Sequence, residues 1–314
     1  MSKSVLDKVP LLSLGAMETA DFAAAFGDSF QRFGFAMVKD HGMDQALIEQ
    51  GWSLARRFFA QPEAVKQRHD ARTNGGQRGY TAFGTEIAKG ANENDLKEFW
   101  HIGRDLPAGD PLAQTMPPNV WPEEIAEFRP VFTRLYAEFE RVGAQLLSAI
   151  ALYLGLEQDW FKGPTRDGNS ILRLLHYPPV SAQAPGIRAA PHEDINLITL
   201  LLGADEGGLE LRDCNGDWLP VVPPPGALAI NVGDMLQRLT NHRLPSTSHR
   251  VVNPPPERRG FSRYSMPFFL HLRPDFVIDA LPQCVDEAHP RREAPITAHD
   301  YLTERLREIG LIKG

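Results

Sequence analysis

The segment HEDINLITLLL, residues 192 to 202, places ionisable side chains directly against a strongly apolar run. The apolar end predicts a buried strand, and polar groups beside it are costly to bury unless they find partners. On a strand, side chains two residues apart point to the same face. We therefore expect His192 and Asp194 to project together and Glu193 to point away. An imidazole and a carboxylate on one face provide two ligands for a divalent metal.

A third ligand must come from another part of the chain, and we favour His249. It stands in LPSTSHRVV, one residue before two β-branched residues that predict a second strand. His242 lies nearby, but it follows Asn241 in a polar, turn-like stretch. Two histidines and one carboxylate on one side of an iron leave the opposite positions open, an arrangement typical of non-haem Fe(II) oxygen chemistry. Zinc accepts the same ligands, so the residue types alone leave the metal open.

These residues also have a simpler interpretation. The chain has ten histidines, so an H-x-D pattern with a distant histidine can arise without any metal. His192 would then lie at the rim of a pocket, and Asp194 would cap a turn. A zinc hydrolase is a further alternative, but it needs a general base beside the metal. Glu193 is the only adjacent acid, and it is expected to point away.

A second group of polar residues, RYS at 263 to 265, lies in a predicted strand. Arg263 and Ser265 share one face of that strand. A planar guanidinium beside a hydroxyl suits a carboxylate, because the guanidinium can bind both carboxylate oxygens. Tyr177 closes the strand ILRLLHY and adds another hydroxyl donor. The alternative for Arg263 is an ordinary surface arginine on a strand.

The elements that must position these residues follow from the apolar pattern. Residues 72 to 120 are rich in Gly, Asn and Pro and predict long loops. Helices are expected from spacings of three and four, and they cover residues 22–33, 44–59, 128–154 and 297–309. Strands are expected at 9–14, 35–40, 170–177, 195–202, 208–213, 218–222, 227–232, 235–240 and 262–270.

Many short strands without helices between them, from residue 170 onward, indicate a β-sandwich or barrel. The simplest such fold is a jelly roll. We expect a mainly β protein with flanking helices: a double-stranded β-helix core and a long supporting helix. Residues 1–120 would form an N-terminal α/β region packed on the core. Residues 121–314 would form the helix and jelly roll, and together the two regions would make one structural unit.

The composition is that of an ordinary globular protein. Apolar residues make up 42% and charged residues 23% of 314, and the net charge is −7. No basic block suggests nucleic acid, and no apolar run suggests a membrane span or signal peptide. Cys214 and Cys284 lack a zinc-type spacing and favour a reducing compartment. We expect a cytoplasmic protein with a small-molecule substrate; the sequence leaves its oligomeric state open.

Together these segments resemble the isopenicillin N synthase-like branch of the Fe(II)/2-oxoglutarate-dependent oxygenases. VPLLSL, FGDSFQRFGFAMVKDHGM and FFAQPEAVKQ are similar to its N-terminal region. QRGYTAFG and DLKEFWHIG follow in the family's order. HEDINLITLLL resembles its H-x-D strand, and HRVV and RYSMPFF resemble its distal histidine and R-x-S segment. LHYP stands where the family has N-Y-Y-P, so two polar positions depart from the pattern.

The resemblance implies a jelly roll that binds Fe(II) and 2-oxoglutarate and uses O2. The substrate would be hydroxylated, desaturated or cyclised as succinate and carbon dioxide are released, and no side chain need act as general acid or base. The implied metal ligands are His192, Asp194 and His249. The implied contacts to 2-oxoglutarate are Tyr177, Arg263 and Ser265.

Two alternatives remain open within this interpretation. Some members of the branch use the R-x-S pair on the carboxylate of their own substrate and need no 2-oxoglutarate. A non-catalytic metal-binding jelly roll would retain the same residues without turnover. The substrate itself is not specified by the sequence. The residues considered for lining its pocket are Tyr80, Phe83, Phe99, Trp100 and His101, for which ordinary packing is the competing interpretation.

Overall fold

The computed structural model describes residues 8–70, 76–86, 93–181, 186–203 and 206–308. Its helices are α1 (Thr19–Phe33), α2 (Gln45–Phe59), α3 (Glu63–Lys66), α4 (Phe128–Tyr153), α5 (Lys162–Thr165), α6 (Asp234–Leu239) and α7 (Ala298–Glu308). Its strands are β1 (Leu11–Ser13), β2 (Phe35–Lys39), β3 (Gly79–Thr81), β4 (Glu98–Gly103), β5 (Ile171–Tyr177), β6 (Ala189–His192), β7 (Ile198–Leu202), β8 (Leu209–Arg212), β9 (Trp218–Pro220), β10 (Leu228–Val232), β11 (His249–Val251), β12 (Arg263–Leu270), β13 (Val277–Ile278) and β14 (Ile296–Thr297).

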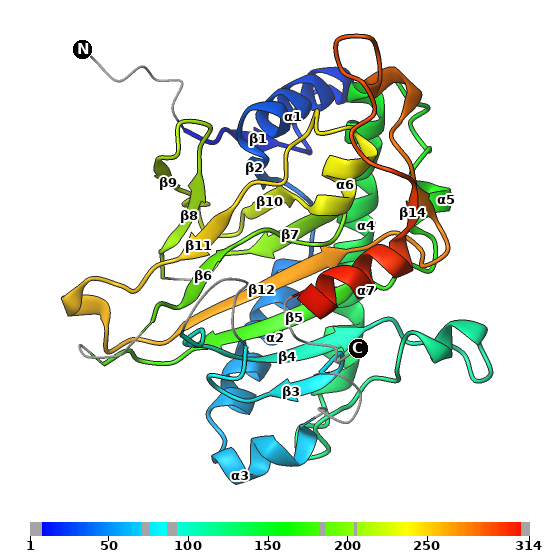
Figure 1. Cartoon of the computed structure of the whole chain (residues 1–314). Coiled ribbons are helices and arrows are strands. Elements are labelled where there is room, and N and C mark those ends of the chain that lie inside the picture. The colour runs from blue at the N-terminus through cyan, green and yellow to red at the C-terminus, as the bar shows by residue number, and fades with distance from the viewer. Residues whose placement is uncertain (1–7, 71–75, 87–92, 182–185, 204–205, 309–314) are drawn as a thin grey trace.

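Two β-sheets form the centre of the protein. The larger has eight strands in the order β1-β2-β10-β7-β12-β5-β4-β3, and the smaller has four in the order β6-β11-β8-β9. Neighbouring strands are antiparallel except for the parallel pair β1 and β2. Helix α4 passes behind the strands in the view of Figure 1. The expected mainly β protein with a jelly-roll core and a long supporting helix is confirmed.

Strands from both halves of the chain share the larger sheet. β1 to β4 come from the first 120 residues, and β5, β7, β10 and β12 come from the rest. The division of the chain at residue 120 remains a prediction. The helices and strands expected in the N-terminal third are found, with Asp44 capping α2 by accepting hydrogen bonds from the amides of Ala46 and Leu47.

Three expectations about secondary structure are wrong. Residues 72–120 contain the strands β3 and β4 in place of long loops. All six residues of β4 are buried, so its sequence shows no alternation of apolar and polar residues. Residues 71–75 and 87–92 lie outside the described part. MLQRLT forms most of helix α6 instead of a strand, since Met235, Leu236 and Leu239 are buried at helical spacing. HEDINLITLLL is not one strand: β6 ends at His192 and β7 begins at Ile198.

A helix-facing core lies on one side of the larger sheet. Phe268 of β12 is fully buried there and stacks on Phe139 of α4, with ring centroids 5.3 Å apart and ring planes 10° apart. Tyr136 meets the same ring edge-on at 5.1 Å. At Gly143, a Cβ atom would lie 2.4 Å from Cδ1 of Leu270, so this glycine lets the helix approach the strand closely.

A second core lies between the two sheets and holds the opposite face of β12. The larger sheet contributes Phe35, Leu175 and Ala229 to it, and the smaller sheet contributes Leu211 and Val251. Because side chains alternate along a strand, the residues of β12 that face away from α4 point between the sheets. The functional residues predicted from the sequence lie on this inner side.

We expect Phe268→Ala to lower the free energy of unfolding by about 3–5 kcal/mol, because it leaves a cavity between α4 and β12. Phe261→Ala is the matched control: Phe261 is 50% exposed, so its replacement should change stability by less than about 0.5 kcal/mol. Urea denaturation followed by far-UV circular dichroism measures both. Equal effects of the two substitutions would contradict the proposed importance of the α4–β12 contact.

Candidate metal centre

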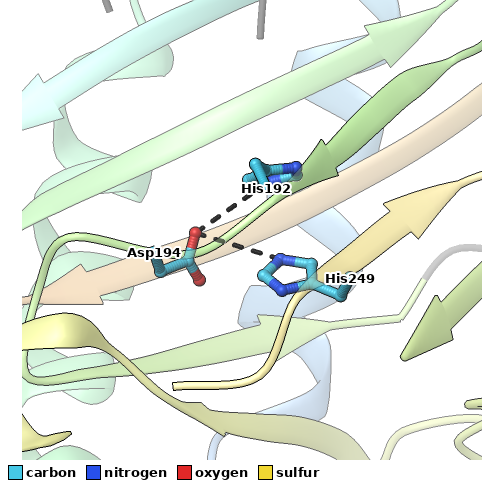
Figure 2. Close-up of side chains that lie close together, drawn as sticks. All are labelled: His192, Asp194 and His249. Carbon is cyan, nitrogen blue, oxygen red and sulfur yellow. Dashed lines mark ion pairs between the residues drawn. The ribbon is translucent and has the colours of Figure 1, made fainter. Parts of the chain in front are cut away.

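The ladder between β6 and β11 brings the two predicted histidines together. His249 is the pairing partner of His192 in this antiparallel ladder, and the two ring centroids lie 4.4 Å apart. Figure 2 shows both rings next to the carboxylate of Asp194. The Nε2 atoms of His192 and His249 lie 4.0 and 3.9 Å from Oδ1 of Asp194. One ligand atom from each of the three residues lies within 4.8 Å of the others, a spacing that fits one shared cation.

Asp194 reaches this position from a loop and not from a strand. The strand argument that placed it beside His192 is therefore wrong, although the two side chains do meet. Its backbone carbonyl accepts a hydrogen bond of 2.7 Å from the amide of Asp234, at the start of α6. Gly233 lets the start of α6 lie this close to the loop that carries Asp194, because a Cβ atom at residue 233 would lie only 2.1 Å from the carbonyl oxygen of Asn196 in that loop.

Two neutral donors occupy the other oxygen of the Asp194 carboxylate. Oδ2 accepts hydrogen bonds from Oγ1 of Thr199 at 2.6 Å and from Nδ2 of Asn231 at 2.7 Å. Burial raises the pKa of Asp194, but the nearby histidines and these two hydrogen bonds outweigh burial and hold the pKa below its usual range. The carboxylate is thus ionised, and its Oδ1 lies between the two imidazoles.

Both imidazoles are oriented through their Nδ1 atoms. Nδ1 of His192 donates to the carbonyl of Ala190 at 2.8 Å, and Nδ1 of His249 donates to that of Thr247 at 3.1 Å. Burial and the neighbouring His249 lower the pKa of His192 to about 4, so this imidazole is neutral near pH 7. A neutral imidazole with a proton on Nδ1 presents its lone pair at Nε2, which is the form that binds metals.

Arg263 and Ser265 share one face of β12, as expected, are 96% and 99% buried, and line the same cavity as His192, Asp194 and His249. We call this space the inner cavity. Nη1 of Arg263 donates to Oγ of Ser265 at 3.2 Å, and Nε donates to the carbonyl of Glu206 at 3.1 Å. The ring of Tyr177, also a lining residue, lies 5.0 Å from the Arg263 guanidinium carbon. All three residues predicted for the cosubstrate therefore lie in one cavity.

Sequence reasoning missed a second buried guanidinium nearby. Arg188 is fully buried, and its guanidinium carbon lies 6.0 Å from the centroid of the Tyr177 ring. Its Nη2 donates to the carbonyl of Phe261 at 3.1 Å, whereas Nε and Nη1 have no partner among the described residues. Burial, with Arg263 close by, lowers the pKa of Arg188. Two buried guanidinium groups therefore lie near the Tyr177 ring at this end of the inner cavity.

A larger outer cavity, of about 430 Å³, is lined in part by His192 and Asp194. His101 lines it, as expected. The other residues considered for this role lie elsewhere: Tyr80 and Trp100 are in the helix-facing core, Phe99 packs between the sheets, and Phe83 is 48% exposed. The outer cavity is instead lined by charged residues that the sequence analysis did not select, among them Glu86, Asp95, Lys97 and Arg173.

An ion-pair network in this wall leads to a testable expectation. Glu86 lies 2.7 Å from Nζ of Lys97 and 3.4 Å from Nη1 of Arg173. Burial raises the pKa of Glu86, but Lys97 and Arg173 outweigh it and keep the pKa well below its usual range. The charged form therefore stabilises the fold above the unfolded-state pKa of about 4.3, and this stabilisation is lost as pH falls further.

We expect Glu86→Gln to reduce the free energy of unfolding by about 3 kcal/mol at pH 7, because the buried cations Lys97 and Arg173 lose a negative charge that pairs with both. Its stability should also fall less steeply than that of the parent when pH drops from 5 to 3. Urea titrations at several pH values measure both effects. A variant whose stability runs parallel to that of the parent over this range would show that Glu86 does not contribute in this way.

The comparisons with known proteins agree with this geometry. A family model described as "non-haem dioxygenase in morphine synthesis N-terminal" matches residues 9–124, and one described as "2OG-Fe(II) oxygenase superfamily" matches residues 168–272. A 2-oxoglutarate-Fe(II) type oxidoreductase from Aspergillus fumigatus is 33% identical over 87% of this chain and 83% of its own length. Kihadalactone A synthase from Citrus sinensis is 30% identical over 96% of this chain and 94% of its own.

Solved structures give the same result. A 2OG-Fe(II) oxygenase family protein from Caulobacter crescentus is 53% identical, covers 96% of this chain and 99% of its own, and has a TM-score of 0.90. A full-length Neurospora crassa protein in complex with α-ketoglutarate is 29% identical, covers 98% and 99%, and has a TM-score of 0.86. These findings favour 2-oxoglutarate use over a cosubstrate-free oxidase or a non-catalytic binding protein. The chain belongs to the isopenicillin N synthase-like 2OG-Fe(II) oxygenases and is a non-haem Fe(II) 2-oxoglutarate-dependent dioxygenase.

Proposed function

We propose that His192, Asp194 and His249 hold the Fe(II) of this dioxygenase. The observation that carries the proposal is the convergence of two imidazole Nε2 atoms and one carboxylate oxygen, with each remaining polar atom of the three side chains engaged by the protein. Two nitrogen ligands and one oxygen ligand on one side suit Fe(II), and they leave the other coordination positions open. Bound there, Fe(II) supplies the activation of O2 that couples 2-oxoglutarate decarboxylation to substrate oxidation.

We further propose that Arg263, Ser265 and Tyr177 bind the distal carboxylate of 2-oxoglutarate. The support is their place in the inner cavity, which the metal-site residues also line. Arg263 is held by Ser265 and by the carbonyl of Glu206, so its guanidinium is oriented before any ligand arrives. Such preorganisation reduces the entropy lost on binding. Arg188 adds a second positive charge behind Tyr177 and strengthens the attraction for an anion.

The substrate of this reaction is a small organic molecule bound in the outer cavity, next to the metal ligands. Two further structures of the Neurospora crassa protein, which contain thymine and 5-formyluracil, are 29% and 28% identical to this chain. Pyrimidine bases are therefore a first class to screen. Within the described residues, no helix is long and apolar enough to cross a membrane. Cys214 and Cys284 are both free thiols, which supports the proposed reducing, cytoplasmic location.

The roles of His192 and Asp194 can be tested by substitution. We expect His192→Ala and Asp194→Ala each to abolish iron-dependent conversion of 2-oxoglutarate to succinate, because each loses one of three metal ligands. His242→Asn is the matched control: His242 pairs with Glu293 at 2.9 Å and has a φ of 67°, which asparagine tolerates. Succinate is measured after aerobic incubation with Fe(II). Full activity in either alanine variant would remove the metal-ligand assignment.

The role of Arg263 predicts a selective loss of cosubstrate affinity. Arg263→Met should weaken 2-oxoglutarate binding by about 3–5 kcal/mol, since it leaves a carboxylate without its buried partner. Arg258→Ala is the control, because Arg258 pairs with Glu206 at the surface and is 46% exposed. Anaerobic calorimetric titration of Fe(II)-loaded protein with 2-oxoglutarate gives both affinities. An unchanged affinity in Arg263→Met would assign the carboxylate to another residue, with Arg188 the next to test.

A further inference from the structure

The outer and inner cavities share a wall at the metal site. Five residues line both: His192 and Asp194 of the metal site, and Lys97, Arg173 and Phe269 beside them. Any substrate oxidised at this centre must place its reacting carbon next to these residues. Lys97 and Arg173 are the two cationic side chains that line both cavities. The inference that follows rests on the function proposed above and concerns the substrate class.

Arg173 is held in one orientation. Its guanidinium carbon lies 4.3 Å from the centroid of the Phe99 ring and 5.2 Å from that of the Phe269 ring. Its Nε donates to Nε2 of His101, and its Nη1 donates to Glu86 at 3.4 Å. His101 accepts this hydrogen bond as a neutral imidazole, because its Nδ1 donates to the carbonyl of Gly76 at 3.0 Å. Nη2 takes part in neither hydrogen bond, and 17% of the side chain remains exposed.

Lys97 is held in a similar way. Its ammonium group lies 2.7 Å from a carboxylate oxygen of Asp95 and 2.7 Å from one of Glu86. The other oxygen of Asp95 accepts a hydrogen bond from the amide of Ala190, two residues before His192. An ammonium has three N–H donors, and these two contacts use two of them. Lys97 and Arg173 therefore present immobilised donors at the wall of the outer cavity.

The four charges of the Lys97–Arg173 network balance one another, and Arg305, the other lysine or arginine that lines the outer cavity, has an ion pair of its own. Lys97 and Arg173 carry two positive charges, and Glu86 and Asp95 carry two negative ones. A substrate carboxylate would add a buried charge without a counter-ion of its own, and a substrate ammonium would face the two cations. A carbonyl oxygen accepts hydrogen bonds from both donors without adding charge. We propose that the substrate is an uncharged molecule that presents the carbonyl oxygen of an amide, imide or lactam to Arg173 and Lys97.

This contact also sets which carbon is oxidised. The carbonyl is fixed at the polar wall, and Ile171, Phe269 and Leu302 provide apolar surface in the same cavity for the rest of the molecule. Anchoring one end of a small molecule limits the C–H bonds that can lie next to the metal. The protein therefore selects the site of oxidation by geometry, with the oxidised carbon a short distance from the anchored carbonyl.

The parent protein tests the charge argument without any variant. Glutarimide, 2-piperidone, hexanamide, hexanoate and hexylamine are titrated anaerobically into protein loaded with Fe(II) and 2-oxoglutarate. The uncharged carbonyl compounds are expected to bind more tightly than the acid and the amine, and to raise succinate formation above the background seen without substrate. Equal or tighter binding of hexanoate or hexylamine, or no binding of any carbonyl compound, overturns the inference.

Arg173→Met tests the residue, with Arg104→Met as the matched control. Arg104 is a similarly buried arginine that pairs with Glu140 and lines neither cavity. Loss of a hydrogen bond to a charged donor is expected to weaken binding of the tightest carbonyl compound about 10- to 100-fold in Arg173→Met and to leave it unchanged in Arg104→Met. Thermal unfolding checks that both variants fold. An unchanged affinity in a folded Arg173→Met protein overturns the inference.

The background reaction separates this inference from the proposed function. If the parent protein forms no succinate from 2-oxoglutarate with Fe(II) present, the proposed function itself fails. If it forms succinate but shows no preference for uncharged carbonyl compounds, the proposed function stands and only the substrate class is wrong. The two failures therefore give different results in the same set of assays.

Discussion

The structure of the centre depends on one strand pairing, that of β6 with β11. This pairing sets His192 opposite His249 and fixes the distance between the two imidazoles. A shift of one residue would turn one imidazole to the opposite face of the smaller sheet. The interior between the sheets prevents such a shift, since Val251 and Leu211 are buried beside His249 in the same ladder. Hydrophobic packing thus maintains the geometry of a polar site.

Asp194 requires a different support because it lies beyond the end of β6. Its backbone is tied to the start of α6, and its side chain is tied to Thr199 and Asn231, polar residues within otherwise apolar strands. A polar side chain in such a strand is costly unless it has a partner. Thr199 and Asn231 could therefore have been selected from the sequence as supports of a buried charge.

The sequence predicts the elements with a clear period and the residues within strongly patterned motifs. The structure confirms the helix predicted from the spacing of Phe22, Phe26, Phe30 and Phe33, the long apolar face of α4 and the alternation in β12. The sequence does not show that β4 is a buried strand with a neighbour on each side, or that MLQRLT is a helix, because short apolar runs fit either type. It also does not show Lys97, Arg173 and Arg188 as site residues. Arg173 and Arg188 are single charges in apolar stretches, and Lys97 stands between Asp95 and Glu98. Only tertiary pairing reveals which cavity each side chain lies near.

Four titratable side chains that line the outer cavity suit a reaction in which the protein positions its reactants and transfers no proton. Burial lowers the pKa of His271, which lines the outer cavity, to about 4, and it lowers that of His101 well below the usual value. Both imidazoles are therefore neutral near pH 7, and His101 already uses its two nitrogens in hydrogen bonds. Glu86 and Asp95 are held by Lys97. His101, Glu86 and Asp95 thus hold the donors of Arg173 and Lys97 in place. The metal and its cosubstrate supply the chemistry, and the shape and polarity of the cavity wall determine the selectivity.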